Sequence, residues 1–253
     1  MRALRGVGLL AVALVVTACA TTEPARPKDD PEKRARINTQ LAFEYAKDGK
    51  YRIAVEKLEK ALEADRGHVD AHIAGGVIYS RLGEWDTAED HYRRAVSLDD
   101  ENITALNNYG LFLCSRGRHE EGLERFERAL DLPLNTNPVV TLNNAGQCAY
   151  EDARLELAEK YLREALQIEP RLSRALLTMG KLSFEYDRDL SARAYLQRFH
   201  SVARETAESL WLGVRVELAL GDRDAARGYA RRLRASFPDS LEAGELAELT
   251  LKP

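Results

Sequence analysis

The sequence predicts an all-α protein: a right-handed superhelical solenoid built from pairs of helices. Three observations lead to this expectation. Of the 253 residues, 45% are hydrophobic but only 7% are aromatic, and Ala, Leu, Glu and Arg are plentiful, as is typical of packed helices. A pattern of apolar and small residues recurs about every 34 residues. Within that repeat, Gly or Ala returns at fixed places.

Residues 1–18 are predicted to be a lipoprotein signal peptide. A basic start precedes an uncharged apolar stretch over residues 6–16, which is too short for a permanent membrane helix of about 20 residues. The end of this region and the residue after it, Val16 to Cys19, resemble the lipobox of bacterial lipoproteins. That resemblance implies that Cys19 is acylated and becomes the first residue of the mature chain. An ordinary secretory signal with an incidental cysteine is the alternative.

Residues 19–34 are expected to form the lipidated N-terminus and a flexible tether. Pro24, Pro27 and Pro31 interrupt this charged stretch, and no apolar period runs through it. Ala20 follows the cysteine, whereas Asp at that place usually retains such lipoproteins in the inner membrane. By this resemblance we expect a lipid anchor in the outer membrane, with the solenoid in the periplasm.

Six repeats are predicted to fill residues 35–240. Their ranges are 35–68, 69–102, 103–136, 139–172, 173–206 and 207–240. The two extra residues before Val139 fall in the stretch 134–138, which contains two Asn and a Pro and therefore predicts a longer loop.

Small residues mark the same places in successive repeats. The eighth place holds Ala42, Gly76, Gly110, Gly146, Gly180 and Val214. Because Gly inside a helix costs about 1 kcal/mol relative to Ala, its recurrence indicates that two helices cross closely there. The fifteenth place, where Gly49, Gly83, Gly117 and Gly221 stand, predicts a left-handed turn after the first helix. Ala153 and Asp187 depart from this pattern, so we expect differently shaped turns in repeats four and five.

This pattern resembles the tetratricopeptide repeat family, which implies two antiparallel helices per repeat and six stacked repeats. After Ser240, the leucines at 241, 246, 249 and 251 suggest a last helix that covers the exposed end of the stack. Residues 241–253 are therefore predicted to be a capping helix and tail.

The sequence contains little that suggests catalysis. His68 and His72 are spaced i, i+4, but no cysteine or acidic ligand set accompanies them, so surface or packing roles are more common for such histidines. No phosphate-binding loop and no serine nucleophile motif is present. The net charge of −4 argues against a nucleic-acid binder. We therefore expect no enzymatic activity, no cofactor, no metal site and no small-molecule substrate.

Cys114 and Cys148 lie in the predicted first helices of repeats three and four. These helices are neighbours in a solenoid, and the predicted compartment is oxidising. We therefore hypothesise a disulfide between the two cysteines. Two buried free thiols are the alternative.

The first helices of such a superhelix line its concave face, where partner segments bind. The ninth place changes from apolar (Phe43, Val77, Leu111) in the first three repeats to polar or basic in the last three. Amide side chains nearby suit a peptide backbone. The expected partner-binding groove comprises Phe43, Lys47, Ile73, Val77, Arg81, Asn107, Leu111, Asn143 and Gln147. The alternative is that some of these residues merely pack between adjacent helices.

The chain further resembles the PilF/PilW-type pilotins of type IV pilus biogenesis. The resemblance lies in the lipobox, the six-repeat length, and the segments Asn107–Gly110, Phe112–Cys114 and Asn143–Gly146 with Cys148. It implies an outer-membrane lipoprotein that binds subunits of the type IV pilus secretin and promotes their outer-membrane localisation and multimerisation. A general periplasmic adaptor, scaffolding cell-wall hydrolases or outer-membrane assembly factors, is the alternative.

Overall fold

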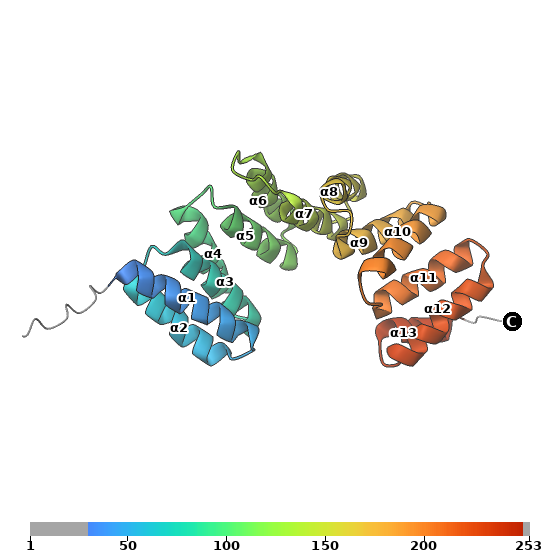
Figure 1. Cartoon of the computed structure of the whole chain (residues 1–253), viewed down its shortest axis with the longest axis horizontal. Coiled ribbons are helices and arrows are strands. Elements are labelled where there is room, and N and C mark those ends of the chain that lie inside the picture. The colour runs from blue at the N-terminus through green and yellow to red at the C-terminus, as the bar shows by residue number, and fades with distance from the viewer. Residues whose placement is uncertain (1–29, 250–253) are drawn as a thin grey trace, which may run out of the picture.

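The computed structural model describes residues 30–249, and all of the regular secondary structure in this range is α-helical. Figure 1 shows the helices following one another in chain order along an arch. The predicted all-α fold class is confirmed. The predicted signal peptide, Cys19, most of the tether and Leu251 lie outside the described residues. No helix within residues 30–249 is long and apolar enough to cross a membrane.

Six helix pairs and one final helix make up the structure. The pairs are α1 (Pro31–Lys47) with α2 (Tyr51–Ala64), α3 (Val69–Leu82) with α4 (Trp85–Leu98), α5 (Ile103–Ser115) with α6 (His119–Asp131), α7 (Val139–Glu151) with α8 (Leu155–Ile168), α9 (Ser173–Glu185) with α10 (Asp189–Val202), and α11 (Ala207–Ala219) with α12 (Arg223–Ser236). The final helix is α13 (Leu241–Glu248). From the second pair onward, each first helix begins at the residue where a repeat was expected to start.

The curvature of the stack follows from which helices touch. Each first helix packs against its own second helix and against the first helix of the next pair. Consecutive second helices make no comparable contacts within residues 30–249. The first helices are therefore crowded on the inner, concave side of the arch, and the second helices fan out on its outer side (Figure 1).

Helix α1 begins earlier than expected, at Pro31 rather than Ala35. The side chain of Asp30 accepts a hydrogen bond from the Lys33 backbone N–H at 3.1 Å, which caps the helix. Proline suits the first helical position because its fixed φ is already helical and its missing N–H would have no partner there. The prediction that residues up to 34 belong to the tether was therefore wrong for residues 31–34.

Glycines in the first helices make room for large side chains of the second helices. A Cβ atom placed on Gly110 would lie 2.7 Å from the Phe126 ring and 3.1 Å from the Gly122 backbone oxygen. A Cβ atom on Gly76 would clash with the Tyr92 ring in the same way. These contacts explain why Gly stands at the eighth place of repeats two and three, where Tyr92 and Phe126 lie opposite.

The turns inside repeats four and five keep the left-handed conformation without glycine. Ala153 and Asp187 both have φ of 55°, close to the φ of 72° to 79° at the four turn glycines. The expectation that these two turns are shaped differently was therefore wrong. A non-glycine residue in this region costs roughly 1–2 kcal/mol, so these repeats accept some local strain.

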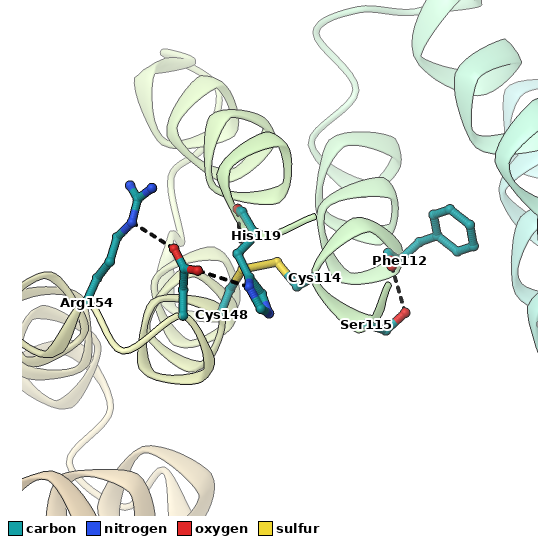
Figure 2. The surroundings of a disulfide bond; sticks show 7 residues. Phe112, Cys114, Ser115, His119, Cys148 and Arg154 are labelled. Atoms are coloured by element: carbon teal, nitrogen blue, oxygen red, sulfur yellow. Dashed lines mark hydrogen bonds and ion pairs between the residues drawn. A yellow bond between two sulfur atoms is a disulfide. The ribbon is translucent and has the colours of Figure 1, made fainter. Parts of the chain in front are cut away.

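A disulfide joins the third and fourth repeats (Figure 2). It connects Cys114 near the end of α5 with Cys148 in α7, with the Cα atoms 5.7 Å apart. Next to it, His119 Nδ1 lies 3.1 Å from Asp152 Oδ1, and Arg154 Nε lies 2.8 Å from Asp152 Oδ2. The loop before α7 also lies at this junction, where the Asn135 amide donates to the Ala129 carbonyl at the end of α6. Covalent and polar links thus hold the irregular junction between repeats three and four.

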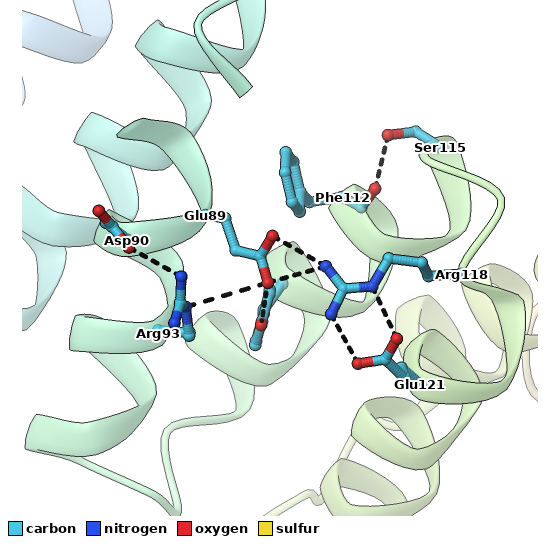
Figure 3. Close-up of polar contacts among 8 residues, drawn as sticks. Glu89, Asp90, Arg93, Phe112, Ser115, Arg118 and Glu121 are labelled. Carbon is cyan, nitrogen blue, oxygen red and sulfur yellow. Dashed lines mark hydrogen bonds and ion pairs between the residues drawn. The ribbon is translucent and has the colours of Figure 1, made fainter. Parts of the chain in front are cut away.

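A second link joins repeats two and three through Arg118, the residue that precedes α6 (Figure 3). Its guanidinium donates to both carboxylate oxygens of Glu89 on α4 at 2.8 Å and to both of Glu121 at 2.6 Å. The Tyr109 hydroxyl donates to Glu89 as well, at 3.0 Å. Burial alone would raise the pKa of Glu89, but hydrogen bonds from Arg118 and Tyr109 lower it below its usual value. Glu89 therefore remains an anion that bridges two repeats.

The last helix covers the end of the stack through two residues. Ala243 and Leu246 are buried against α11 and α12, whereas Leu241 is 77% exposed. Leu241 therefore does not take part in the cap as the sequence suggested.

Glycine 110 offers a direct test of the helix crossing. We expect Gly110→Ala to lower the free energy of unfolding by about 1–3 kcal/mol, because the new methyl group overpacks the contact with Phe126. Gly228→Ala in α12 is the matched control, since a Cβ atom there would meet nothing within 4 Å. In this control Ala should raise stability by up to about 1 kcal/mol. Urea unfolding followed by circular dichroism measures both, and equal shifts in the same direction would contradict the crossing.

The disulfide should contribute strongly to stability. Closing a chain separation of 34 residues is worth roughly 3–4 kcal/mol through the entropy of the unfolded chain. We expect a reducing agent to lower the urea midpoint of the wild type but not that of the Cys114→Ala/Cys148→Ala variant. A wild-type midpoint that reductant does not change would show that the bond is not formed in solution.

Candidate functional site

Three apolar side chains on consecutive first helices reach the concave face. Phe43 on α1 is 36% exposed, Leu111 on α5 is 38% exposed, and Val77 on α3 between them is partly buried. All three occupy the ninth place of their repeat. Because α1, α3 and α5 pack side by side, the three residues form one apolar strip.

Two adjoining hollows follow this strip, and we call them together the N-terminal groove. The first has a volume of about 550 Å³ and is lined by Phe43, Ala46, Lys47, Tyr51, Val77 and Arg81. The second has a volume of about 370 Å³ and is lined by Val77, Ser80, Arg81, Tyr92, Asn108, Leu111, Phe112 and Ser115. Val77 and Arg81 line both hollows, so the groove is continuous across the first three repeats.

Five of the nine predicted groove residues thus lie in the groove: Phe43, Lys47, Val77, Arg81 and Leu111. The sequence did not single out Tyr51 or Asn108. Asn108 lies three residues before Leu111 and therefore on the same side of α5, a spacing that could have identified it. Tyr51 begins α2 beyond the turn, where the periodicity of the first helix gives no information.

Ile73 does not line the groove, and this part of the prediction was wrong. Its side chain is only 2% exposed and packs with Ala95 of α4 and Ala105 of α5. The fifth place of repeat two therefore faces the next repeat instead of the concave surface.

The three predicted amides are also packed between helices. Asn107, Asn143 and Gln147 are each 8% exposed. The Asn107 amide donates to the Thr141 hydroxyl at 2.9 Å, and the Thr178 hydroxyl donates to the Gln147 carbonyl oxygen at 2.8 Å. These bonds join α5 to α7 and α7 to α9. Packing between adjacent first helices, the alternative that the sequence left open, describes these residues.

A separate hollow of about 260 Å³ lies at the other end of the concave face, and we call it the C-terminal cleft. Its lining comes from α9, α11 and α13 and comprises Lys181, Glu208, Trp211, Leu212, Arg215, Leu241, Glu242 and Glu245. Lys181 forms an ion pair with Glu208 at 2.7 Å, and the Arg215 guanidinium lies 4.5 Å from the centre of the Phe184 ring. The basic ninth-place residues of repeats five and six are therefore held by intramolecular contacts.

Of the two closely spaced histidines of the sequence, His72 packs against His91 of α4, whereas His68 Nδ1 lies 3.9 Å from Asp65 Oδ2. His72 Nδ1 lies 3.2 Å from His91 Nδ1, and His72 Nε2 lies 3.1 Å from the Arg66 carbonyl oxygen. The His91 ring stacks on Tyr79 and lies above Gly75. Burial, and secondarily the nearby His72, lowers the pKa of His91 to about 4. Within residues 30–249, no group of three or more His, Cys, Asp or Glu side chains is placed to hold a metal ion.

Family models place tetratricopeptide repeats over much of the chain. Three models described as tetratricopeptide repeats match residues 39–103, 101–171 and 208–240. These matches fall on the observed helix pairs. They confirm that the solenoid is made of tetratricopeptide repeats.

Similar proteins take part in type IV pilus formation. The type IV pilus assembly protein PilF of Pseudomonas aeruginosa is 31% identical over 240 residues, which cover 94% of each chain. The crystal structure of PilW, a widely conserved type IV pilus biogenesis factor, superposes with a TM-score of 0.78 at 32% identity and covers 84% of this chain and 98% of that one. The structure of Pseudomonas aeruginosa PilF gives a TM-score of 0.79 at 30% identity, with coverage of 87% and 99%.

The buried pair of His72 and His91 predicts that the folded protein loses stability as the pH is lowered. Because the native pKa of His91, about 4, lies below its unfolded value near 6.5, the unfolded state binds more protons between these pH values. The contribution of His91 to stability is therefore complete above about pH 6.5 and is lost as the pH falls toward 4.

We expect His91→Phe, which keeps a ring above Gly75, to make the fall in urea midpoint between pH 6.5 and 4.5 shallower than in the wild type. His68→Gln, outside the pair, serves as the control and should leave the slope unchanged. Equal slopes in wild type and His91→Phe would contradict the assignment.

Proposed function

Because the chain belongs to the PilF/PilW-type family of tetratricopeptide repeat proteins, which act in type IV pilus biogenesis, we propose that it is a pilotin for the pilus secretin. In this role it is a non-enzymatic outer-membrane lipoprotein. It binds secretin subunits through the repeat solenoid and promotes their outer-membrane localisation and multimerisation.

The observation that supports this proposal best is the N-terminal groove. A continuous groove lined by three apolar side chains is the kind of surface to which protein partners bind. Aromatic and aliphatic anchors that enter such hollows supply most of the binding energy in protein interfaces. We assign the groove to a segment of the secretin subunit.

Stacked repeats suit this task because each unit is fixed by its neighbours. The groove is built from three consecutive first helices, and the links through Glu89–Arg118 and Cys114–Cys148 restrain the repeats beside it. A surface held in its binding conformation loses little conformational entropy when the partner docks. This rigidity supports a binding role and requires no catalytic group.

The proposed anchor explains how binding would promote assembly. Cys19 and Asp30, the residue that caps α1, are eleven positions apart in the sequence. A span of this length reaches at most about 40 Å when fully extended. An acylated Cys19 would therefore confine bound secretin subunits to a thin layer beside the membrane. Confinement raises their effective concentration and so favours ring formation.

Deletion of the gene tests the proposed function. We expect loss of heat-resistant secretin multimers and of twitching motility in the deletion strain, and recovery of both on complementation with the wild-type chain. Intact multimers and pili in the deletion strain would reject the pilotin role. Co-purification of cell-wall hydrolases or outer-membrane assembly factors in place of the secretin would instead identify a general periplasmic adaptor.

The groove is tested with Leu111→Arg in the complementing gene. A charge in the middle of the apolar strip should weaken secretin retention by at least about tenfold, because the arginine side chain would have to be desolvated against the partner. Leu190→Arg on α10 is the matched control, since Leu190 is 70% exposed and lies outside both hollows. Thermal melts should be unchanged for both variants. Retention of the secretin by Leu111→Arg would contradict groove binding.

A further inference from the structure

The charged residues that line the N-terminal groove are all basic. Lys47 and Arg81 line it, and no carboxylate lines either hollow. Each cation follows the apolar ninth-place residue of its repeat by four positions, Phe43 in one case and Val77 in the other. Side chains spaced i, i+4 lie on the same face of a helix, so an apolar group and a cation are paired twice on adjacent helices.

Several other cations of the solenoid are bound by carboxylates of the chain itself. Arg118, Arg188 and Lys181 each form ion pairs with glutamates of neighbouring helices. Lys47 and Arg81 form no ion pair within the described part of the chain, although the protein as a whole carries a net charge of −4. The groove is therefore a basic site on an acidic protein, which attracts opposite charge and disfavours like charge.

The opposite end of the concave face has the reverse character. The C-terminal cleft contains the carboxylates of Glu208, Glu242 and Glu245. Two cations also line it, but Lys181 is paired with Glu208 and Arg215 lies against the Phe184 ring, so carboxylates outnumber cations there. A partner segment that carries carboxylates is therefore favoured in the N-terminal groove and disfavoured in the C-terminal cleft.

The geometry points to one kind of occupant for the N-terminal groove: a protein segment that carries both apolar side chains and carboxylates. Neighbouring helix axes lie about 8–10 Å apart, so the three first helices span roughly 20 Å. An extended segment of about six residues covers this distance at 3.3 Å per residue. Carboxylates that meet Lys47 and Arg81 on adjacent helices are then about three residues apart.

A protein segment fits this site better than an anionic membrane. The apolar residues lie on the inner side of the arch, on helices that crowd together, and a segment of chain can enter these hollows while a flat bilayer surface cannot. The assignment rests on the proposed function in one respect, namely that the groove holds the partner on which the chain acts.

A peptide comparison tests the chemistry directly. The probes are three eight-residue peptides that share three leucines and differ only at two positions three residues apart, which hold Glu, Gln or Lys. We expect the full chain to bind the Glu peptide at least about tenfold more tightly than the Gln peptide, with the advantage shrinking as salt is raised. Equal affinities for the Glu and Gln peptides, or no binding of the Glu peptide, would overturn the inference.

A variant in which the two groove cations are replaced by carboxylates provides the second part of the test. Lys47→Glu/Arg81→Glu should lose the preference for the Glu peptide and gain one for the Lys peptide. Arg231→Glu/Arg234→Glu, on exposed positions of α12, makes the same change in net charge and should behave as the wild type. Thermal melts of both double variants show that they are folded. A reversed variant that still prefers the Glu peptide would overturn the inference.

Retention of the secretin separates the two proposals. If the wild type retains the secretin and the Lys47→Glu/Arg81→Glu variant retains it equally, the charge assignment fails while the pilotin role stands. If the wild type binds the Glu peptide but retains no secretin, the charge assignment stands and the pilotin role fails.

Discussion

The close crossing of two helices inside each repeat is the constraint on which the rest of the structure depends. Gly110 allows the Phe126 ring to lie where a Cβ atom would be 2.7 Å away, and Gly76 does the same for Tyr92. Because the pairs are this compact, first helices can also pack on one another from repeat to repeat, while second helices diverge. The concave face, and the exposure of Phe43 and Leu111 on it, follow from this packing.

Much of the fold could be predicted from the repeat period. The close crossing of two helices requires a small residue at a fixed place in each repeat, and these small residues are visible in the sequence. The same period placed Cys114 and Cys148 on adjacent first helices, where they lie close enough to be bonded. It failed at Pro31, where composition suggested a tether but capping by Asp30 and the fixed φ of proline start a helix. It failed again at the turns of Ala153 and Asp187, where the packing of the repeat imposes a backbone that glycine would adopt more easily.

The groove residues were harder to predict, for a geometric reason. The fifth and ninth places of a helix differ by four residues and therefore point only about 40° apart. Whether a side chain at either place is exposed depends on the neighbouring helix. Asn107 is covered because Thr141 approaches from α7, and Gln147 because Thr178 approaches from α9. Leu111 has no such neighbour and stays exposed. Periodicity identifies the face of a helix, but the side chains of the next repeat decide which part of that face is free.

The polar links between repeats explain why the concave face can act as one surface. Arg118 and Arg188 each precede a second helix and each reach back 29 residues to a glutamate of the previous repeat. Partly exposed ion pairs of this kind contribute little stability individually. Their effect is to fix the angle between neighbouring repeats, and the disulfide does the same at the junction that the longer loop interrupts.

Lys47 and Arg81 lie on the same framework without such partners, so their charges remain available on a surface whose shape is already set. A solenoid that uses several of its cations to link its own repeats, and leaves these two without an ion pair beside an apolar strip, presents a surface on the first three repeats that is both basic and apolar.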